Sequence, residues 1–143
     1  DLRMYFDSYK PILLKVSPDL SHQQLDEIID YCLRSGIDGI VAGNTTRSRD
    51  GITSISQEKI EEIGNGGLSG APLHNKNLEL VKYVHARSEG RLPIVGVGGI
   101  MSPEQAKAML DAGASLVEIY SGFVYEGPAL IKNINKYLET NTK

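Results

Sequence analysis

A lysine lies inside an apolar run near the start of the chain, and its charge needs a partner. Residues 12–16 read Ile-Leu-Leu-Lys-Val, which is typical of a strand buried on both faces, with Lys15 as the exception. A buried ammonium group costs several kcal/mol unless it is paired. An edge-strand lysine that reaches solvent is the simpler alternative. The position therefore predicts an anion near the end of this strand.

Two further apolar runs lead directly into residues that suit a phosphate. Residues 94–97 run into Gly98-Gly99, and residues 115–119 run into Tyr120-Ser121. Glycines let backbone amides approach an anion with no Cβ in the way. Tight turns alone explain many such glycine pairs, so each pair is weak evidence by itself.

A polar triplet and a glycine-rich segment add two more elements. Asn44-Thr45-Thr46 follows the apolar run at residues 39–43, and Gly-Gly-Leu-Ser-Gly occupies residues 66–70. Asparagine and threonine also cap ordinary turns, so the triplet has a purely structural alternative. Amide and hydroxyl groups at a strand end could instead orient a planar polar ligand.

The elements that must position these residues form two similar units. Residues 11–44 and residues 93–122 each begin with proline and an apolar strand, continue through a helix and end in a second strand. A strand–helix–strand unit implies parallel, right-handed pairing. Since parallel strands end at the same edge of a sheet, all four polar segments are expected at one end.

Helix boundaries within the units are marked by capping signals. Ser21 with Gln24, and Ser102 with Gln105, are predicted to form two capping boxes. Each helix is expected to end at a glycine, Gly36 in the first unit and Gly113 in the second.

Between the two units we expect a long insertion at residues 45–73 and a helix at about residues 77–88, and a final helix is expected from Pro128. Four parallel strands alternating with helices fit half of an eight-stranded β/α barrel or a small open α/β sheet. Phosphate loops after the last two strands are frequent in barrels, whereas a Rossmann fold carries its glycines after its first strand. The glycine positions favour the barrel, as one domain over residues 1–143.

Composition narrows the class of protein. The chain has 143 residues, 41% of them hydrophobic, and no run near the ~20 apolar residues that span a bilayer. A net charge of −3 argues against a nucleic-acid surface. The single cysteine, Cys32, allows no internal disulfide and no multi-cysteine metal site, and it falls on a predicted helix face. A globular protein located in the cytoplasm, with no metal site, is expected.

A lysine, a glycine phosphate loop and side-chain amides at one barrel mouth suit a phosphorylated cofactor with an electron-accepting ring. Flavin mononucleotide (FMN) has both parts. A fixed cation such as Lys15 would stabilise the negative charge of its reduced ring.

The sequence resembles the dihydroorotate dehydrogenase family, and its class 2, quinone-linked branch most closely. The segments that carry the resemblance are LLKVSPDL, DGIVAGNTT, GGLSGAPL and PIVGVGGIMSPEQAKAMLDAGASLVEIYSGFVYEGP, in the order of the family and over nearly the whole chain. The resemblance implies an FMN-bound β/α barrel that oxidises dihydroorotate to orotate in pyrimidine synthesis, with a quinone as electron acceptor.

The resemblance also implies roles for individual residues. Lys15 is similar to the flavin-contacting lysine of the family, and Asn44 and Thr45 are similar to its orotate-binding pair. The expected FMN contacts at the ring edge and the phosphate are Gly43, Gly70, Gly98, Gly99, Tyr120 and Ser121. The family usually has threonine at the position of Gly43.

The resemblance covers only the second half of the enzyme. The catalytic base of class 2, a serine, is expected upstream of residue 1, together with an N-terminal segment that would place the full-length protein peripherally at the inner membrane. No catalytic residue is therefore predicted in this chain. Four strands without the other half leave open edges, so the chain is expected to self-associate or to pair with the missing N-terminal half.

Three functions remain as alternatives. The chain is part of a working dehydrogenase, or a half-barrel that binds phosphate or FMN without turnover, or part of another phosphate-binding barrel enzyme. The NTT and GGLSG segments together argue against the third.

Overall fold

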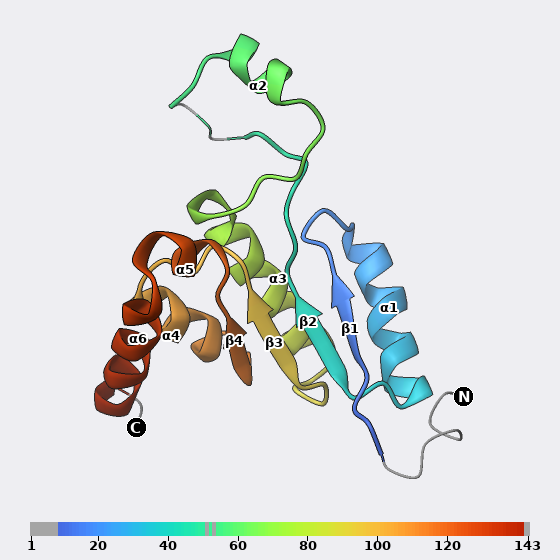
Figure 1. The fold of residues 1–143 in the computed structure, drawn as a ribbon. Coiled ribbons are helices and arrows are strands. Elements are labelled where there is room, and N and C mark those ends of the chain that lie inside the picture. The colour runs from blue at the N-terminus through green and yellow to red at the C-terminus, as the bar shows by residue number, and fades with distance from the viewer. Residues whose placement is uncertain (1–8, 51, 53, 142–143) are drawn as a thin grey trace.

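The computed structural model describes residues 9–50, 52 and 54–141, and its centre is one parallel sheet (Figure 1). The strands pair in chain order, all parallel: β1 (Leu13–Val16), β2 (Gly39–Ala42), β3 (Ile94–Val97) and β4 (Leu116–Glu118). The predicted α/β class and the parallel pairing are confirmed. The fourth strand is shorter than the run expected at residues 115–119.

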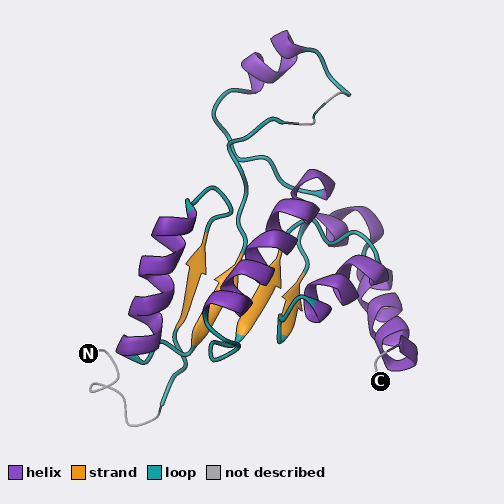
Figure 2. Cartoon of the chain, turned by 180° about the vertical axis from the view of Figure 1, so that it is seen from behind, coloured by secondary structure: helices purple, strands orange, loops and turns teal. Residues whose placement is uncertain are grey.

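The principal helices lie on one side of this sheet, in front of the strands or beside the edge strands in Figure 2. They are α1 (His22–Ser35), α3 (His74–Arg87), α4 (Pro103–Asp111) and α6 (Pro128–Asn141). Sequential strand order with one-sided helices is the arrangement of a barrel wall, whereas a doubly wound sheet reverses its order and has helices on both faces. None of the described helices is long and apolar enough to cross a membrane.

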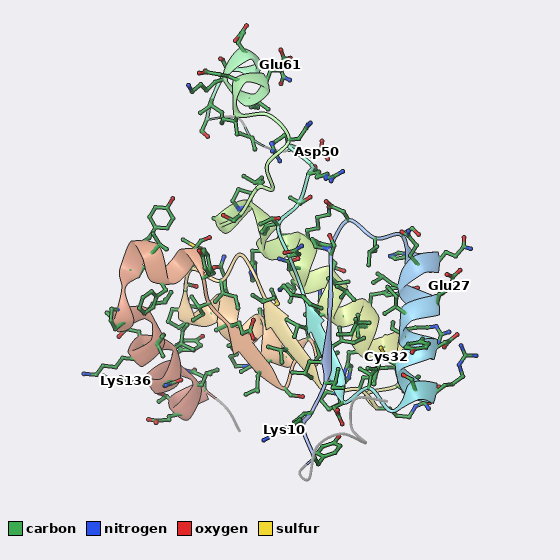
Figure 3. All side chains as sticks on the ribbon, turned by 45° about the vertical axis from the view of Figure 1, so that its right-hand side comes forward. Lys10, Glu27, Cys32, Asp50, Glu61 and Lys136 are labelled. Atoms are coloured by element: carbon green, nitrogen blue, oxygen red, sulfur yellow. The ribbon has the colours of Figure 1, made fainter. Side chains whose placement is uncertain are left out.

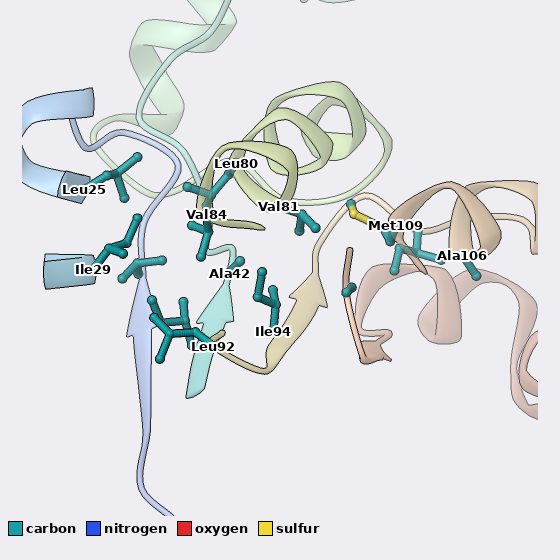
Figure 4. Close-up of a cluster of buried hydrophobic side chains, with 14 of the residues drawn as sticks. Leu25, Ile29, Ala42, Leu80, Val81, Val84, Leu92, Ile94, Ala106 and Met109 are labelled. Carbon is teal, nitrogen blue, oxygen red and sulfur yellow. The ribbon is translucent and has the colours of Figure 1, made fainter. Parts of the chain in front are cut away.

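The core lies between the sheet and this helix layer (Figure 4). Ile40, Ala42 and Ile94 are fully buried on the strands, and Ile29 and Met109 are fully buried on the helices that face them. Cys32 is also buried, on the inner side of α1 (Figure 3), and burial raises the pKa of its thiol. These observations support packing rather than reactivity as the role of this cysteine.

The opposite face of the sheet is open. Leu13 is 44% exposed, Lys15 is exposed and Leu116 is 65% exposed, whereas Val16, next to Lys15, is buried. The expectation that residues 12–16 form a strand buried on both faces is therefore wrong for this chain. Alternate residues of β1 face the helices or the open side, because successive side chains of a strand point to opposite faces.

One of the two predicted capping boxes is complete. The Ser21 hydroxyl accepts from the Gln24 amide, and the Gln24 side chain accepts from the Ser21 amide. Ser102 accepts from the Gln105 amide in the same way, but the Gln105 side chain accepts from Met101 N–H at 2.8 Å. The second box was expected to have the Gln105 side chain bonded to the Ser102 amide. That prediction is wrong by one residue, because the bonded amide is that of Met101.

Both predicted helix stops are confirmed. Gly36 caps α1 with a φ of 72°. Gly113 follows α4 with a φ of 111°, and the amides of Gly113 and Ala114 donate to carbonyls of the last turn. This pair of bonds is the Schellman arrangement, which favours glycine at its left-handed position.

The insertion at residues 45–73 contains more structure than expected. It projects beyond the strand ends as an arm that carries α2 (Gln57–Ile63), and Asp50 and Glu61 lie on this arm in Figure 3. It ends in a 3₁₀ turn, η2 (Ala71–Leu73), which leads into α3 three residues before the predicted helix start. A further short helix, α5 (Ser121–Glu126), lies between β4 and α6.

Candidate functional site

A cavity of about 610 Å³ lies at the carboxyl ends of the strands. This volume is in the range of small-molecule and cofactor sites. The cavity is lined by Lys15, Asn44, Thr45, Ser69, Gly70, Leu73, Val97, Gly98, Gly99, Ile100, Glu118, Ile119, Tyr120 and Ser121. Eight of the nine residues predicted to bind cofactor or substrate are in this set, and Gly43 is the ninth. Segments up to 106 residues apart (15 to 121) are thus brought to one place.

Lys15 and Gly43 are joined by a hydrogen bond at the edge of this cavity. The Lys15 ammonium donates to the Gly43 carbonyl at 2.7 Å, and within the described part of the chain it forms no ion pair. One of its three donors is thereby used, and the side chain is held in a fixed direction. The sequence pattern predicted a nearby anion, and the structure shows a backbone carbonyl as the first partner.

Gly43 is buried behind the cavity lining, and its backbone path requires glycine. Its φ is 136°, and a Cβ at this position would overlap the carbonyl oxygen of Val97. A threonine, the usual residue of the family at this position, does not fit this backbone path. Gly43 contributes its carbonyl to Lys15 and presents no side chain to the cavity.

The loop after β3 is a pair of left-handed glycines packed against the start of α3. Gly98 and Gly99 have φ values of 98° and 76°. A Cβ on Gly98 would overlap the amide nitrogen of the Asn77 side chain, and a Cβ on Gly99 would lie 2.5 Å from the His74 Cα. Successive backbone amides in a glycine turn can form a concave anion-binding surface, to which the two glycines add no side chain of their own.

Two side chains with buried polar atoms, fully buried Asn77 and partly buried His74, lie against this loop. Asn77 is fully buried, and neither its amide nitrogen nor its amide oxygen has a hydrogen-bond partner among the described residues. The same holds for Nδ1 of His74. Burial lowers the pKa of His74. Buried polar groups are normally satisfied, so these atoms are exceptions in the packing between the loop and the start of α3.

The loop after β4 forms the opposite wall. Tyr120 is 78% exposed and Ser121 begins α5. Gly70, which has a φ of 88°, lies beside Ser121: a Cβ built on Gly70 would be 3.8 Å from the Ser121 Cβ. The glycine-rich segment from the insertion therefore reaches the same wall as the last strand.

The Asn44-Thr45 pair is held by the same glycine-rich segment. Thr46 and Leu68 form an antiparallel bridge, with amide-to-carbonyl bonds of 3.1 and 2.8 Å. A Cβ on Gly67 would overlap the Thr45 hydroxyl, so glycine at this position leaves room for that group. Asn44 and Thr45 themselves are exposed at the mouth.

Glu118 is a lining residue that the sequence reasoning missed. It lies on β4 and shares the open sheet face and the cavity with Lys15. The available signal was the same as for Lys15: a charged side chain inside an apolar strand, in Leu-Val-Glu-Ile. Ser69, in the glycine-rich segment at residues 66–70, also lines the cavity.

Comparison with known proteins gives one consistent family. The family model described as "Dihydroorotate dehydrogenase" matches residues 4–141. A dihydroorotate dehydrogenase (quinone) of Salinispora arenicola is 51% identical over 123 residues, which are 86% of this chain and 36% of the relative. The protein of the same name from Christiangramia forsetii is 48% identical over 127 residues, covering 89% of this chain and 36% of the relative.

A solved structure agrees with the sequence relatives. The crystal structure of the Eimeria tenella DHODH in complex with ferulenol matches 92% of this chain and 34% of its own length, with a TM-score of 0.83 and 31% identity. The chain therefore spans little more than a third of the proteins that it matches. The four-stranded sheet is a parallel half-barrel, and the chain belongs to the dihydroorotate dehydrogenase family, in its quinone-linked class.

Proposed function

We propose that this chain supplies the FMN-binding and substrate-binding part of an enzyme that oxidises dihydroorotate to orotate and passes the electrons to a quinone. The observation that carries the proposal is the convergence of Lys15, Asn44, Gly99 and Ser121 on one cavity in a member of this family. The activity requires a complete barrel, because the chain matches only 36% of its full-length relatives.

The cavity fits a phosphorylated cofactor. The Gly98-Gly99 loop offers backbone amides in a turn to which the two glycines add no side chain, and Tyr120-Ser121 faces it from the next strand. We assign these four residues to the FMN phosphate and Gly70 to the ring edge. Bound FMN would supply the electron-accepting ring that dihydroorotate oxidation needs.

Lys15 would act as a fixed counter-charge. Its hydrogen bond to the Gly43 carbonyl holds the ammonium at the cavity edge and leaves its other donors available. A cation placed in advance stabilises negative charge that develops beside it and needs little rearrangement to do so. We therefore assign Lys15 to the ring, where reduction adds negative charge, and Gly43 to the support of Lys15.

Asn44 and Thr45 would orient the substrate. Dihydroorotate presents ring amides and a carboxylate, and an asparagine amide can both donate and accept toward such groups. Gly67 leaves room for the Thr45 hydroxyl, and the Thr46–Leu68 bridge fixes the loop from which both side chains project. These residues bind and orient; none of them is assigned the removal of the substrate proton.

The proton-accepting group would come from outside residues 1–143, together with the remaining wall of the barrel. The open sheet face, with Leu13 and Leu116 exposed, is the surface that such a wall would cover. We propose the N-terminal half as its partner and self-association of the isolated chain in its absence. For the complete protein we propose a cytoplasmic location, peripheral at the inner membrane.

A second candidate is a half-barrel that binds FMN without turnover. The glycine loops assigned to FMN lie within this chain, whereas the catalytic base is assigned outside it. This difference favours the second candidate. The two candidates describe the same residues in a complete and an incomplete barrel.

The test compares two proteins. One is the isolated chain, and the other is a complete barrel made by joining this chain to the N-terminal part of the Salinispora arenicola relative. With added FMN, the complete barrel should oxidise dihydroorotate with a soluble quinone, and the isolated chain should not. If the folded complete barrel binds FMN but does not turn over dihydroorotate, the dehydrogenase proposal is wrong and the binding candidate stands.

A further inference from the structure

A carboxylate outside the cavity connects three segments of the chain. Asp19 lies in the turn after β1, and its Oδ1 accepts hydrogen bonds from the Thr46 hydroxyl and from the Lys76 ammonium, both at 2.5 Å. Its Oδ2 accepts from the Arg47 amide at 2.8 Å. The partners lie 27, 28 and 57 residues away in the sequence. The turn after β1, the loop after β2 and the first turn of α3 are thus tied to one side chain.

Thr46 is the centre of this arrangement. Its side chain is 5% exposed, and its hydroxyl donates to Asp19 and accepts from the Ser48 amide and from Lys76. Its backbone forms the bridge to Leu68 in the glycine-rich segment. Thr46 directly follows Asn44-Thr45, so a bond to its side chain fixes the end of the loop that carries both.

The cluster does not line the cavity that holds Lys15. The lining of the 610 Å³ cavity contains Asn44 and Thr45 but not Asp19, Thr46 or Lys76. Asp19 instead lines a separate polar hollow of about 570 Å³, which also contacts Asn44 and Thr45. The loop therefore separates the two hollows, with the candidate ligand on one side and the Asp19 carboxylate on the other.

We propose that Asp19 is a positioning residue: with Thr46 and Lys76 it holds the loop of Asn44 and Thr45 in the orientation that binds dihydroorotate. The proposal rests on the substrate role assigned above to Asn44 and Thr45. Asp19 acts through the loop and does not touch the substrate. The donors from two separate segments, the loop after β2 and the first turn of α3, distinguish it from an ordinary exposed ion pair, which contributes little.

The charge state of the cluster agrees with this role. The hydrogen bond from Lys76, followed by the one from Thr46, lowers the pKa of Asp19 to about 2. The carboxylate is therefore ionised at every pH at which the enzyme would work. An ionised carboxylate accepts hydrogen bonds and donates none. This matches its partners here, because Thr46, Arg47 and Lys76 all donate to it.

The test uses the complete barrel described above, loaded with FMN. Asp19→Asn keeps the shape of the side chain but places an amide NH₂ where a carboxylate oxygen accepted a bond. Thr46→Val removes the central hydroxyl, and Thr46→Ser restores it. Asp111→Asn is the matched control, because Asp111 also pairs with a lysine, Lys107, but on the exposed surface of α4 and within one element.

Three quantities are measured: the KM for dihydroorotate, the dissociation constant of orotate, and the FMN content. Asp19→Asn and Thr46→Val should weaken orotate binding and raise KM by roughly tenfold, because bonds to charged groups are the stronger ones. FMN content should be unchanged. Thr46→Ser and Asp111→Asn should resemble the unaltered enzyme. Unchanged orotate affinity in Asp19→Asn, or equal loss of FMN and orotate, would overturn the proposal.

Hydrogen exchange separates this inference from the function on which it rests. The Arg47 amide donates to Asp19, and the Leu68 amide donates to Thr46. Both should exchange faster in Asp19→Asn, while the amides of β2 keep their rates. If the unaltered barrel binds no orotate but these two amides respond, the substrate assignment fails and the positioning of the loop stands. Unchanged exchange at both amides refutes the positioning role, whatever the activity.

Discussion

Replacing Gly99 by alanine tests whether the loop after β3 must be free of side chains. At a φ of 76°, an alanine is in the left-handed region, which costs roughly 1–2 kcal/mol for an L-residue. The new methyl group would also lie 2.5 Å from the His74 Cα and 2.8 Å from the Leu73 carbonyl carbon. These are backbone atoms at the start of α3, which cannot rotate away, so overpacking adds about 1–3 kcal/mol.

A matched control isolates the second contribution. Gly127 has a φ of 63°, and a Cβ there would meet no atom within 4 Å. Gly127 has a ψ of −160°, a conformation that is also unfavourable for alanine, so Gly127→Ala carries a conformational cost of about 1–3 kcal/mol without any overlap. Gly99→Ala should lower the free energy of unfolding by about 1–3 kcal/mol more than Gly127→Ala does.

The assay is urea unfolding of both variants in the complete barrel, with FMN titrated into each apoprotein by fluorescence quenching. Because the loop must move away from α3, Gly99→Ala should weaken FMN binding at least ~tenfold, equivalent to ~1.4 kcal/mol. Gly127→Ala should bind FMN normally. Equal destabilisation of both variants together with normal FMN affinity would show that the close contact with α3 and the phosphate assignment are both wrong.

Four further predictions concern the other parts of the site. Lys15→Met should lower the midpoint potential of bound FMN, because the reduced ring loses its counter-charge; a redox titration checks this, and an unchanged potential removes Lys15 from the assignment. Asn44→Ala should raise the KM for dihydroorotate while FMN content stays normal; loss of flavin with normal substrate affinity contradicts the pairing of Asn44 with the substrate. The folded-state pKa of Asp19 is about 2, below the ordinary 3.8, so its contribution to stability is present above pH 4 and lost as the pH falls toward 2; acid unfolding of Asp19→Asn should lack this component, and identical curves would exclude it. The isolated chain should sediment as a dimer or larger species at low micromolar concentration, because its sheet edges and open face are uncovered; a stable monomer would contradict this.

Much of the fold could be predicted because its signals are local. Ser21 with Gln24 and the glycines at 36 and 113 mark helix ends through contacts within one or two turns. The two strand–helix–strand units imply parallel pairing, and parallel pairing places Lys15 and Gly99 at one edge. The position of the site could therefore be predicted, because the topology brings the charged and glycine residues that follow the strands to the same end of the sheet.

The rest depended on contacts that the sequence does not display. The helix α2 buries no residue, and its two isoleucines, Ile60 and Ile63, are too few to define an apolar helical face, so the cap at Ser56 was the main signal. The exposure of Leu13 follows from the face left open in this half of the barrel, and an apolar run looks the same with or without a covering wall. Asp19 bonds to residues 27 to 57 positions away, so no local pattern identifies it.

The most direct measurement of the central claim is a single-turnover experiment. The complete barrel containing this chain is loaded with FMN, freed of oxygen, and mixed with dihydroorotate while the absorption of oxidised flavin is followed. We expect dihydroorotate to bleach this absorption and a quinone added afterwards to restore it. A barrel that holds FMN but keeps the oxidised absorption in the presence of dihydroorotate would contradict the claim that this cavity presents the substrate to the flavin.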